Sequence, residues 1–196
     1  GFKAQRLDRP YVRRAGRLAP ASWSEAFAAI AGRVAASAPE RLGAIAGDLA
    51  TVEEMFALKL LMTSLGSGNI DARQDGTKLD PALGRASYVF NPTIAGIDQA
   101  DLILIVGSNP RREAPVLNAR IRKRWRRGGV AVGIVGEPAD LTYPAEPLGA
   151  GPETLASLAA GEGSFGARLA AAKRPVVIVG QGALAREDGA AILALA

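Results

Sequence analysis

Neither cysteine nor histidine occurs in the sequence, and aromatic residues are scarce. Without cysteine, these residues cannot form a disulfide, a four-cysteine iron–sulfur cluster or a thiolate zinc site. Without histidine, they offer no imidazole metal ligand, no histidine general base and no Ser-His-Asp triad. The longest strongly apolar run, residues 102–106, is far shorter than the roughly 20 residues of a membrane-spanning helix. We therefore expect no direct membrane insertion of this segment and no thiolate or imidazole chemistry in it.

The length of 196 residues suits one large domain or two small ones. Hydrophobic residues make up 48% of the chain and charged residues 22%, which is ordinary for a globular protein. The chain starts at Gly1 without a basic-then-apolar leader, so nothing indicates secretion. It ends at Ala196 inside an apolar helical pattern, and we expect it to be a fragment of a longer polypeptide.

The charge balance is skewed, with 24 cationic against 19 acidic residues and a net charge of +5. A GC-rich genome that favours arginine, alanine and glycine codons explains this composition, and we favour that explanation over an anionic partner. Six cations fall within residues 120–127, preceded by Arg111 and Arg112. We interpret the cluster as a solvated helix face with salt bridges to a neighbouring acidic surface. With only 5% aromatic residues, a nucleic-acid interface is the weaker hypothesis, and we expect no nucleic-acid partner.

The first part of the chain is predicted to be an extended lead-in followed by helices. Residues 1–21 are basic and irregular and form the lead-in. Capping boxes at residues 22–25 and 51–54 each precede apolar residues spaced as one face of an amphipathic helix. The same helical phase places Trp23, and in a later helix Trp125, in the hydrophobic core.

Three apolar runs are predicted to be strands, with helical patterns between them. Residues 102–106 are apolar on both faces, as buried parallel strands are, and residues 130–135 and 175–179 are similar. The alternation indicates a Rossmann-like α/β fold with a mainly parallel sheet, helices on both faces and right-handed crossovers. We assign residues 22–196 to this one α/β domain.

Two strand ends carry residues suited to a ligand, since open α/β sheets bind ligands at the carboxyl ends of their strands. The strand 102–106 is followed by Gly107-Ser108-Asn109-Pro110, where glycine allows close approach and serine and asparagine offer hydrogen bonds. A tight turn without a ligand is the alternative. The strand 175–179 is followed by a Gly-x-Gly-x-x-Ala stretch at 180–185. We disfavour NAD or FAD binding there, because the next helix is predicted to begin only near Asp188.

Two motifs carry a resemblance at the level of a superfamily. One runs from Arg6-Leu7 to Ser22-Trp23-Ser24-Glu25-Ala26, and the other is the strand 102–106 with its Gly107-Ser108-Asn109-Pro110 loop. Both resemble the molybdopterin oxidoreductase superfamily, the first at the entry to its domain. The resemblance implies that the chain is a fragment of a molybdopterin oxidoreductase-like domain.

Longer stretches resemble one family within that superfamily more specifically. They are residues 69–76, residues 86–97 and, above all, the stretch that begins Asn109-Pro110-Arg111-Arg112-Glu113 and continues to Lys123. These stretches resemble the large iron–sulfur subunits of respiratory complex I, the NADH:quinone oxidoreductase. The resemblance extends over nearly the whole chain.

This resemblance implies a non-catalytic scaffold segment that has kept the fold and lost the cofactor. The iron–sulfur clusters are then expected in an N-terminal part of the parent subunit, and no cofactor in this segment. In catalytic relatives a cysteine or selenocysteine ligates molybdenum at the stretch corresponding to Arg73-Gln74-Asp75-Gly76, which here offers no soft ligand. Asp75 is a candidate metal ligand, because a carboxylate has that role in respiratory nitrate reductases. We expect no catalytic residue and no bound metal, and a vestigial cofactor site formed by Gly107, Ser108, Asn109 and Pro110.

The same resemblance implies a location and partners. The parent complex transfers electrons from NADH to quinone, coupled to proton translocation. We expect this segment in its peripheral arm, among other peripheral-arm subunits, at the cytoplasmic face of the bacterial inner membrane. Two alternatives remain open. One is a molybdopterin-dinucleotide-binding oxidoreductase domain with Asp75 near the metal, and the other is a basic nucleotide-binding or nucleic-acid-binding module.

Overall fold

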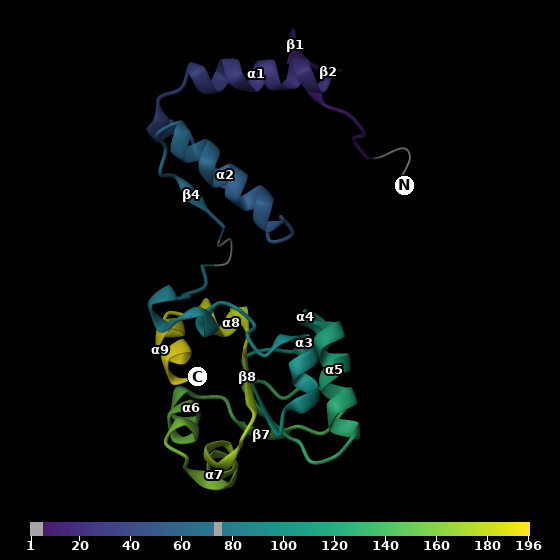
Figure 1. Cartoon of the computed structure of the whole chain (residues 1–196), viewed down its shortest axis with the longest axis vertical. Coiled ribbons are helices and arrows are strands. Elements are labelled where there is room, and N and C mark those ends of the chain that lie inside the picture. Colours follow the sequence, from purple (N-terminus) through teal and green to yellow (C-terminus); the bar gives the residue numbers. More distant parts are fainter. Residues whose placement is uncertain (1–5, 73–75) are drawn as a thin grey trace. The chain divides into compact units, whose positions relative to one another are not determined.

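The computed structural model describes residues 6–72 and 76–196 (Figure 1). The chain divides into two compact units, which we call the N-terminal unit, residues 1–74, and the C-terminal unit, residues 75–196. The assignment of residues 22–196 to one domain stays a prediction.

The N-terminal unit combines short strand pairs with amphipathic helices. Its elements are β1 (Tyr11–Arg14), β2 (Arg17–Pro20), α1 (Trp23–Ala35), η1 (Pro39–Arg41), β3 (Ala44–Ile45), α2 (Val52–Ser64) and β4 (Ile70–Asp71). The strands β1 and β2 form an antiparallel hairpin inside the predicted lead-in, and β3 pairs with β4 in parallel. Gly16 adopts a φ of +81° in the hairpin turn, a conformation that glycine reaches without steric cost.

Both predicted capping boxes are present. At the start of α1 the Ser22 Oγ accepts from the Glu25 N–H at 3.2 Å, and the Glu25 carboxylate accepts from the Ser22 N–H at 2.8 Å. Thr51 and Glu54 repeat the arrangement at the start of α2, at 3.2 and 2.7 Å. These bonds satisfy backbone donors that the first turn of a helix leaves without a partner.

The N-terminal unit buries little of its apolar surface. Among its described residues, Ala46 and Met62 are the buried hydrophobic side chains. The prediction that Trp23 lies in the core is wrong, because Trp23 is 66% exposed and contacts Phe27 with ring centroids 5.6 Å apart. Helical periodicity fixes which residues share a face, but burial requires a second apolar surface, and the described residues of this unit do not supply one for α1.

The C-terminal unit contains the predicted α/β sheet. Short turns and helices precede it: η2 (Pro81–Leu83), η3 (Arg85–Ser87), α3 (Thr93–Gly96) and η4 (Ile97–Gln99). The strands are β5 (Leu102–Val106), β6 (Ala131–Val135), β7 (Glu146–Gly149) and β8 (Pro175–Val179). The helices are α4 (Pro110–Glu113), α5 (Pro115–Arg126), α6 (Pro152–Ala159), α7 (Gly163–Ala171), α8 (Gln181–Leu184) and α9 (Gly189–Leu195).

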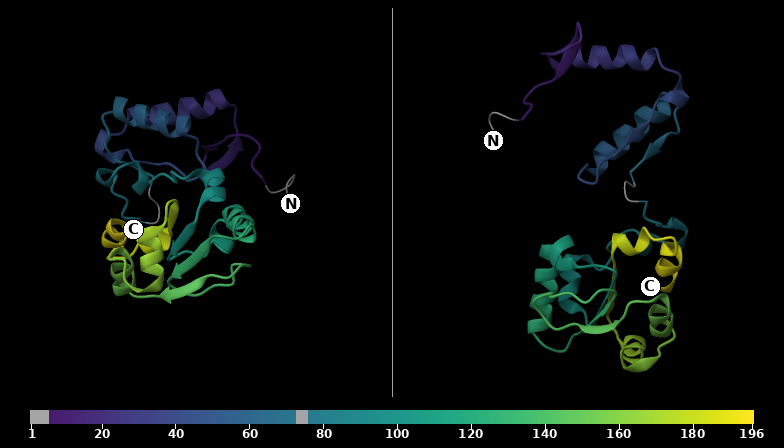
Figure 2. Two further views of the ribbon diagram at one scale, coloured as in Figure 1. Left: turned by 60° about the horizontal axis from the view of Figure 1, so that its bottom comes forward. Right: turned by 180° about the vertical axis from the view of Figure 1, so that it is seen from behind.

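The four strands lie in the order β7-β6-β5-β8, and every pair is parallel. Helices cover both faces of the sheet, as predicted: α5 lies on one side, and α6 and α7 lie on the other (Figure 2). The apolar side chains of β5 alternate between these layers. Ile103 and Ile105 pack with Ile121 of α5, whereas Leu104 packs with Phe165 of α7.

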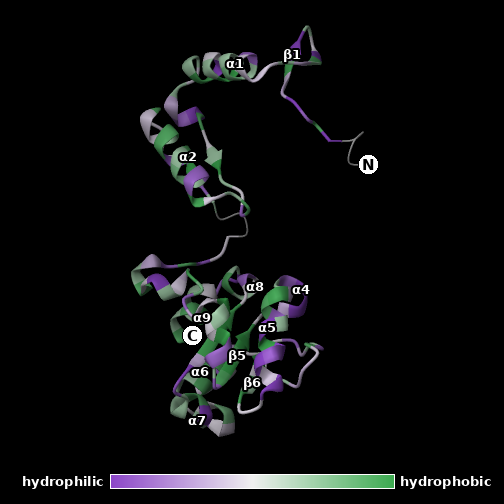
Figure 3. Ribbon diagram, turned by 45° about the vertical axis from the view of Figure 1, so that its right-hand side comes forward, coloured by the Kyte–Doolittle hydropathy of each residue, from purple (hydrophilic) through white to green (hydrophobic). Residues whose placement is uncertain are grey.

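All five residues of β5 are buried, and Figure 3 shows this strand as hydrophobic. Central position and helical cover on both faces account for the continuous apolar run that predicted it. Trp125 of α5 is partly buried and packs against the core cluster of its face, so the expectation of a core position for this second tryptophan is confirmed in part. The fold class predicted from the sequence is confirmed in this unit.

Candidate functional site

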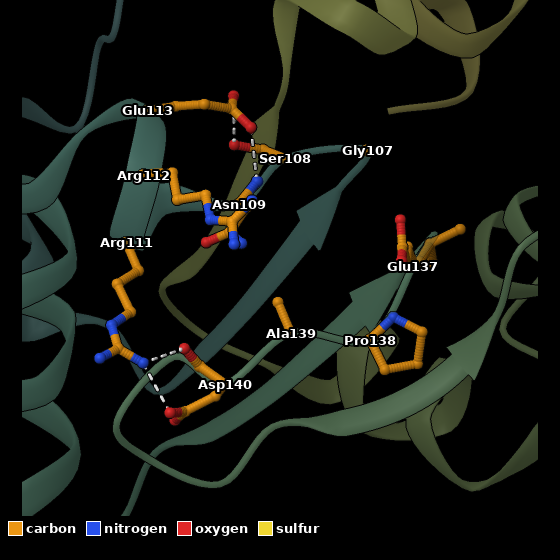
Figure 4. Close-up of a pocket in the computed structure, with 11 residues that line it drawn as sticks. Gly107, Ser108, Asn109, Arg111, Arg112, Glu113, Glu137, Pro138, Ala139 and Asp140 are labelled. Carbon is orange, nitrogen blue, oxygen red and sulfur yellow. Dashed lines mark hydrogen bonds and ion pairs between the residues drawn. The ribbon is translucent and has the colours of Figure 1, made fainter.

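A crevice of about 840 Å³ opens at the carboxyl ends of β5 and β6 (Figure 4). One wall is the loop after β5 with the start of α4, and the other is the loop after β6. The predicted site residues Gly107, Ser108 and Asn109 line it, whereas Pro110 is buried at the first position of α4. The chain turns into the loop at Gly107, where φ is +57° and an added Cβ would lie 2.6 Å from the Ala183 Cβ. Glycine is therefore required at Gly107 by conformation and by packing.

Two hydrogen-bond donors of the loop are already engaged by a side chain of this protein. The carboxylate of Glu113 accepts from the Asn109 N–H at 2.7 Å and from the Ser108 hydroxyl at 2.9 Å. The side-chain oxygen of Asn109 is buried without a hydrogen-bond partner among the described residues. A carboxylate that accepts from a backbone N–H and a hydroxyl uses the same donors that a bound oxyanion would use. Glu113 lies outside the predicted site, although its position one helical turn after Asn109 was a signal available in the sequence.

An ion pair joins the two walls of the crevice. The Arg111 guanidinium donates to the carboxylate of Asp140 at 2.5 Å and to its backbone carbonyl at 3.0 Å. The Thr142 N–H, together with Arg111, lowers the pKa of Asp140 below its usual value. Glu137 and the second arginine, Arg112, also line the crevice. The lining therefore contains three carboxylates and two guanidinium groups.

A buried hydrogen-bond network holds the loop after β6 in place. The Asn118 amide donates to the Leu141 carbonyl at 3.0 Å, and the Tyr143 hydroxyl donates to Asn118 Oδ1 at 2.8 Å. Burial raises the pKa of Tyr143 well above its usual value, so this hydroxyl stays protonated as a donor. Sequence reasoning missed this pair. The signal was a polar residue, Asn118, next to the inward-facing positions of Leu117 and Ile121.

Gly180, directly after the second candidate strand β8, lets this strand end pack closely against the end of β5. The Gly180 N–H donates to the Val106 carbonyl at 2.8 Å, and a Cβ at Gly180 would lie 2.2 Å from the Gly107 carbonyl oxygen. The helix was predicted to begin only near Asp188, and this is incomplete, because the short helix α8 already starts at Gln181. The first glycine of the Gly-x-Gly-x-x-Ala stretch is thus explained by the contact between two strand ends.

The predicted metal candidate, Asp75, lies outside the described residues. Within residues 6–72 and 76–196, no group of three or more aspartate or glutamate side chains gathers in a way that could hold a metal ion. No helix in this same part of the chain is long and apolar enough to cross a membrane.

Most of the basic cluster on α5 has partners, as predicted. The Asp98 carboxylate on η4 forms ion pairs with three cations. The nitrogen to oxygen distances are 3.0 Å for Arg120 and 3.7 Å for both Lys123 and Arg127. The Arg124 guanidinium donates to backbone carbonyls, including that of Ala100 at 2.7 Å. The prediction of a solvated helix face with salt bridges is confirmed for these side chains.

The sequence is similar to known proteins over nearly its whole length. A family model described as molybdopterin oxidoreductase matches residues 6–196. The chain is 47% identical over 195 residues to the G subunit of NADH-quinone oxidoreductase from Rickettsia bellii, and 48% and 43% identical to the proteins of the same name from Rickettsia felis and Rickettsia prowazekii. Each alignment covers 100% of this chain and 28% or 29% of the relative. The chain therefore spans less than a third of the length of these relatives.

Proposed function

The chain belongs to the molybdopterin oxidoreductase family, and we propose that it is a non-catalytic scaffold segment of the G subunit of an NADH-quinone oxidoreductase. Relatives of that name align along the entire chain at 43% to 48% identity. This similarity supports the choice of parent protein, and the crevice after β5 supports the scaffold role.

The observation that carries the scaffold role is the carboxylate of Glu113 on the Gly107–Asn109 loop. The cofactor implied by the family is a pterin dinucleotide, which brings phosphates and a dithiolene-bound metal. The Asn109 N–H and the Ser108 hydroxyl are loop donors of the kind that bind phosphate, and Glu113 already accepts from both. Glu137 and Asp140 add further negative charge to the lining, and Arg111 is paired with Asp140. Arg112 is the one lining arginine without a partner among the described residues, and the lining also holds three carboxylates, so the described residues of the crevice are a poor fit for this cofactor.

In the proposed role, the buried sheet and its helices form a rigid body against which other parts of the complex pack. The parent assembly would transfer electrons from NADH to quinone, coupled to proton translocation, through iron–sulfur clusters held elsewhere in the same polypeptide. The partners would be other peripheral-arm subunits, at the cytoplasmic face of a bacterial inner membrane. The absence of cysteine and histidine agrees with a segment that holds no cluster of its own.

The test uses the NADH-quinone oxidoreductase purified from the host of this chain. Molybdenum, tungsten and oxidised pterin are measured in the complex, together with NADH:quinone turnover per assembled complex. We expect neither metal nor pterin in stoichiometric amount, and unchanged turnover per assembled complex in a Ser108→Ala variant. Arg85→Ala, outside the crevice, is the matched surface control.

Two results would contradict the proposal. One is a stoichiometric pterin dinucleotide with a metal at Asp75, accompanied by loss of turnover in Ser108→Ala but not in Arg85→Ala. That result would favour the alternative of a cofactor-binding oxidoreductase domain. The other is absence of the chain from the purified complex, which would remove the assignment to NADH-quinone oxidoreductase.

A further inference from the structure

The positive charge of the chain is concentrated on one stretch of the C-terminal unit. Residues 110–127, which contain α4 and α5, carry eight cations and one acidic residue. The rest of the chain holds 16 cations and 18 acidic residues, so the whole excess of positive charge comes from this stretch. A codon bias spread along the chain does not explain a charge that is confined to two neighbouring helices.

The protein itself neutralises only part of this charge. Asp98, whose side chain is 22% exposed, is the one carboxylate among the described residues that faces Arg120, Lys123 and Arg127 together. The Arg124 guanidinium donates within the fold, to the Ala100 carbonyl before β5 and to the Gly128 and Gly129 carbonyls after α5. These four side chains therefore have a structural explanation.

Two arginines of α5 have no such explanation. Arg122 and Arg126 are exposed, and no hydrogen bond or ion pair to another described residue engages either guanidinium. They are four residues apart, which places them one above the other on the same side of the helix. Ile121 is buried and Trp125 packs on the core, so the two arginines lie on a different face of the helix from these apolar side chains. Like charges at this spacing repel each other and destabilise a helix unless they meet a counter-charge.

We infer that the outer face of α5, centred on Arg122 and Arg126, is a docking surface for an acidic segment of another protein subunit. This inference rests on the proposed function, which places the chain in a multisubunit complex. Arginine is suited to such a contact, because its planar guanidinium binds a carboxylate through two parallel hydrogen bonds. The neighbouring cations on Asp98 add long-range attraction for an acidic partner and fix its orientation.

A protein partner fits this surface better than a nucleic acid does. Binding of a nucleic acid depends on many phosphate contacts and is commonly completed by exposed aromatic side chains that stack on bases. On α5 only two cations are free of internal partners among the described residues, and its aromatic residue, Trp125, packs against the core. The surface therefore offers a small number of directed contacts, as in a protein interface.

The experiment places a photoreactive benzoylphenylalanine at position 122 of the chain in its native complex. After illumination, the complex is purified and the cross-linked peptides are sequenced. We expect a cross-link to a peptide of another subunit that is rich in aspartate or glutamate. The charge reversal Arg122→Glu/Arg126→Glu is expected to lower the amount of that subunit retained by about tenfold or more. The control Arg33→Glu/Lys59→Glu makes the same change in net charge on α1 and α2 and should leave retention unaltered.

The outcomes separate this inference from the proposed function. If the chain is in the complex but position 122 cross-links to nothing, to another part of the same polypeptide, to lipid, to nucleic acid or to a second copy, the docking surface is wrong and the proposed function stands. Retention that falls equally in both double variants also overturns the docking surface, since total charge then explains the loss. If the chain is not found with NADH-quinone oxidoreductase subunits, the proposed function fails and this inference fails with it.

Discussion

Helices α1 and α5 have nearly the same length and the same kind of amphipathic pattern, yet they have different environments. In the C-terminal unit, α5 packs Ile121 against a buried sheet. In the N-terminal unit, α1 contains no buried residue, and Ile30 is 58% exposed. The comparison shows that sequence periodicity determines which residues share a helix face, whereas burial depends on what the remaining elements bring to that face.

The largest expected effect is a difference in stability between two variants, each of which shortens one isoleucine of α1 or α5. Ile121→Ala removes a side chain that is 0% exposed and leaves a cavity against β5, so it should lower the free energy of unfolding by about 3 kcal/mol. Ile30→Ala, on the exposed face of α1, should cost less than about 1 kcal/mol. Urea titrations of the chain, followed by circular dichroism, measure both values. Equal losses in the two variants would show that α1 is buried in solution and would remove the contrast between the units.

The two tryptophans test the same difference in burial between α1 and α5 with a larger side chain. Trp125→Ala should cost about 2 to 3 kcal/mol, because Trp125 is only partly buried against its core cluster. Trp23→Ala should cost less than about 1 kcal/mol, since the indole is largely exposed. The fluorescence of each single-tryptophan variant provides a second measurement: Trp125 should emit at shorter wavelength than Trp23 and be less quenched by acrylamide.

The fold of the C-terminal unit was predictable because its strongest signals are local. An apolar run such as residues 102–106, short and rich in β-branched residues, favours a strand covered on both faces, and the loop 107–110 then lies at the carboxyl edge of the sheet. The capping boxes were predictable for the same reason, since each lies within one turn of a helix. The position of the crevice therefore follows from the sequence.

The chemistry inside the crevice depends on pairings that residue type alone does not specify. Glu113 could have faced solvent like any surface glutamate, and only the turn of α4 brings its carboxylate onto the Ser108 hydroxyl and the Asn109 N–H. The bond between Asn118 and Tyr143 joins residues 25 positions apart. Burial of Trp23 was wrongly predicted because the existence of a covering surface is a property of the tertiary structure.

A smaller effect is expected when the buried network behind the crevice is broken. Tyr143→Phe keeps the ring in place but leaves Asn118 Oδ1 without its donor, which should cost about 1 to 2 kcal/mol. Tyr88→Phe, at a half-exposed position in the same unit, is the control and should change stability by less than about 0.5 kcal/mol. Thermal unfolding of the two variants measures both losses of stability. A loss in Tyr88→Phe as large as that in Tyr143→Phe would contradict a specific role for the buried bond.

The smallest expected effect is the loss of folding stability in acid, which we compare for one carboxylate from each unit. Burial opposes ionisation of Asp98, but Lys123, Arg120 and Arg127 outweigh it and hold the pKa of Asp98 below its ordinary value of 3.8. The Ser22 N–H and the Arg14 guanidinium lower the pKa of Glu25 below its ordinary value of 4.5. A carboxylate whose pKa is lower in the folded state stabilises that state at pH values above its unfolded pKa, and this stabilisation disappears as the pH falls through the folded pKa.

The expected loss of stability therefore begins near pH 4.5 for Glu25 and near pH 3.8 for Asp98, and it continues as the pH decreases. Both ion pairs are partly exposed, so salt should weaken the effect. Urea titrations between pH 6 and pH 2.5 should show a smaller acid-induced loss in Asp98→Asn than in the unmodified chain. The same loss in Asp98→Asn as in the unmodified chain would mean that the three cations of α5 do not stabilise the folded C-terminal unit through Asp98. In that case Arg120, Lys123 and Arg127 would join Arg122 and Arg126 as charges that need a partner outside the unit.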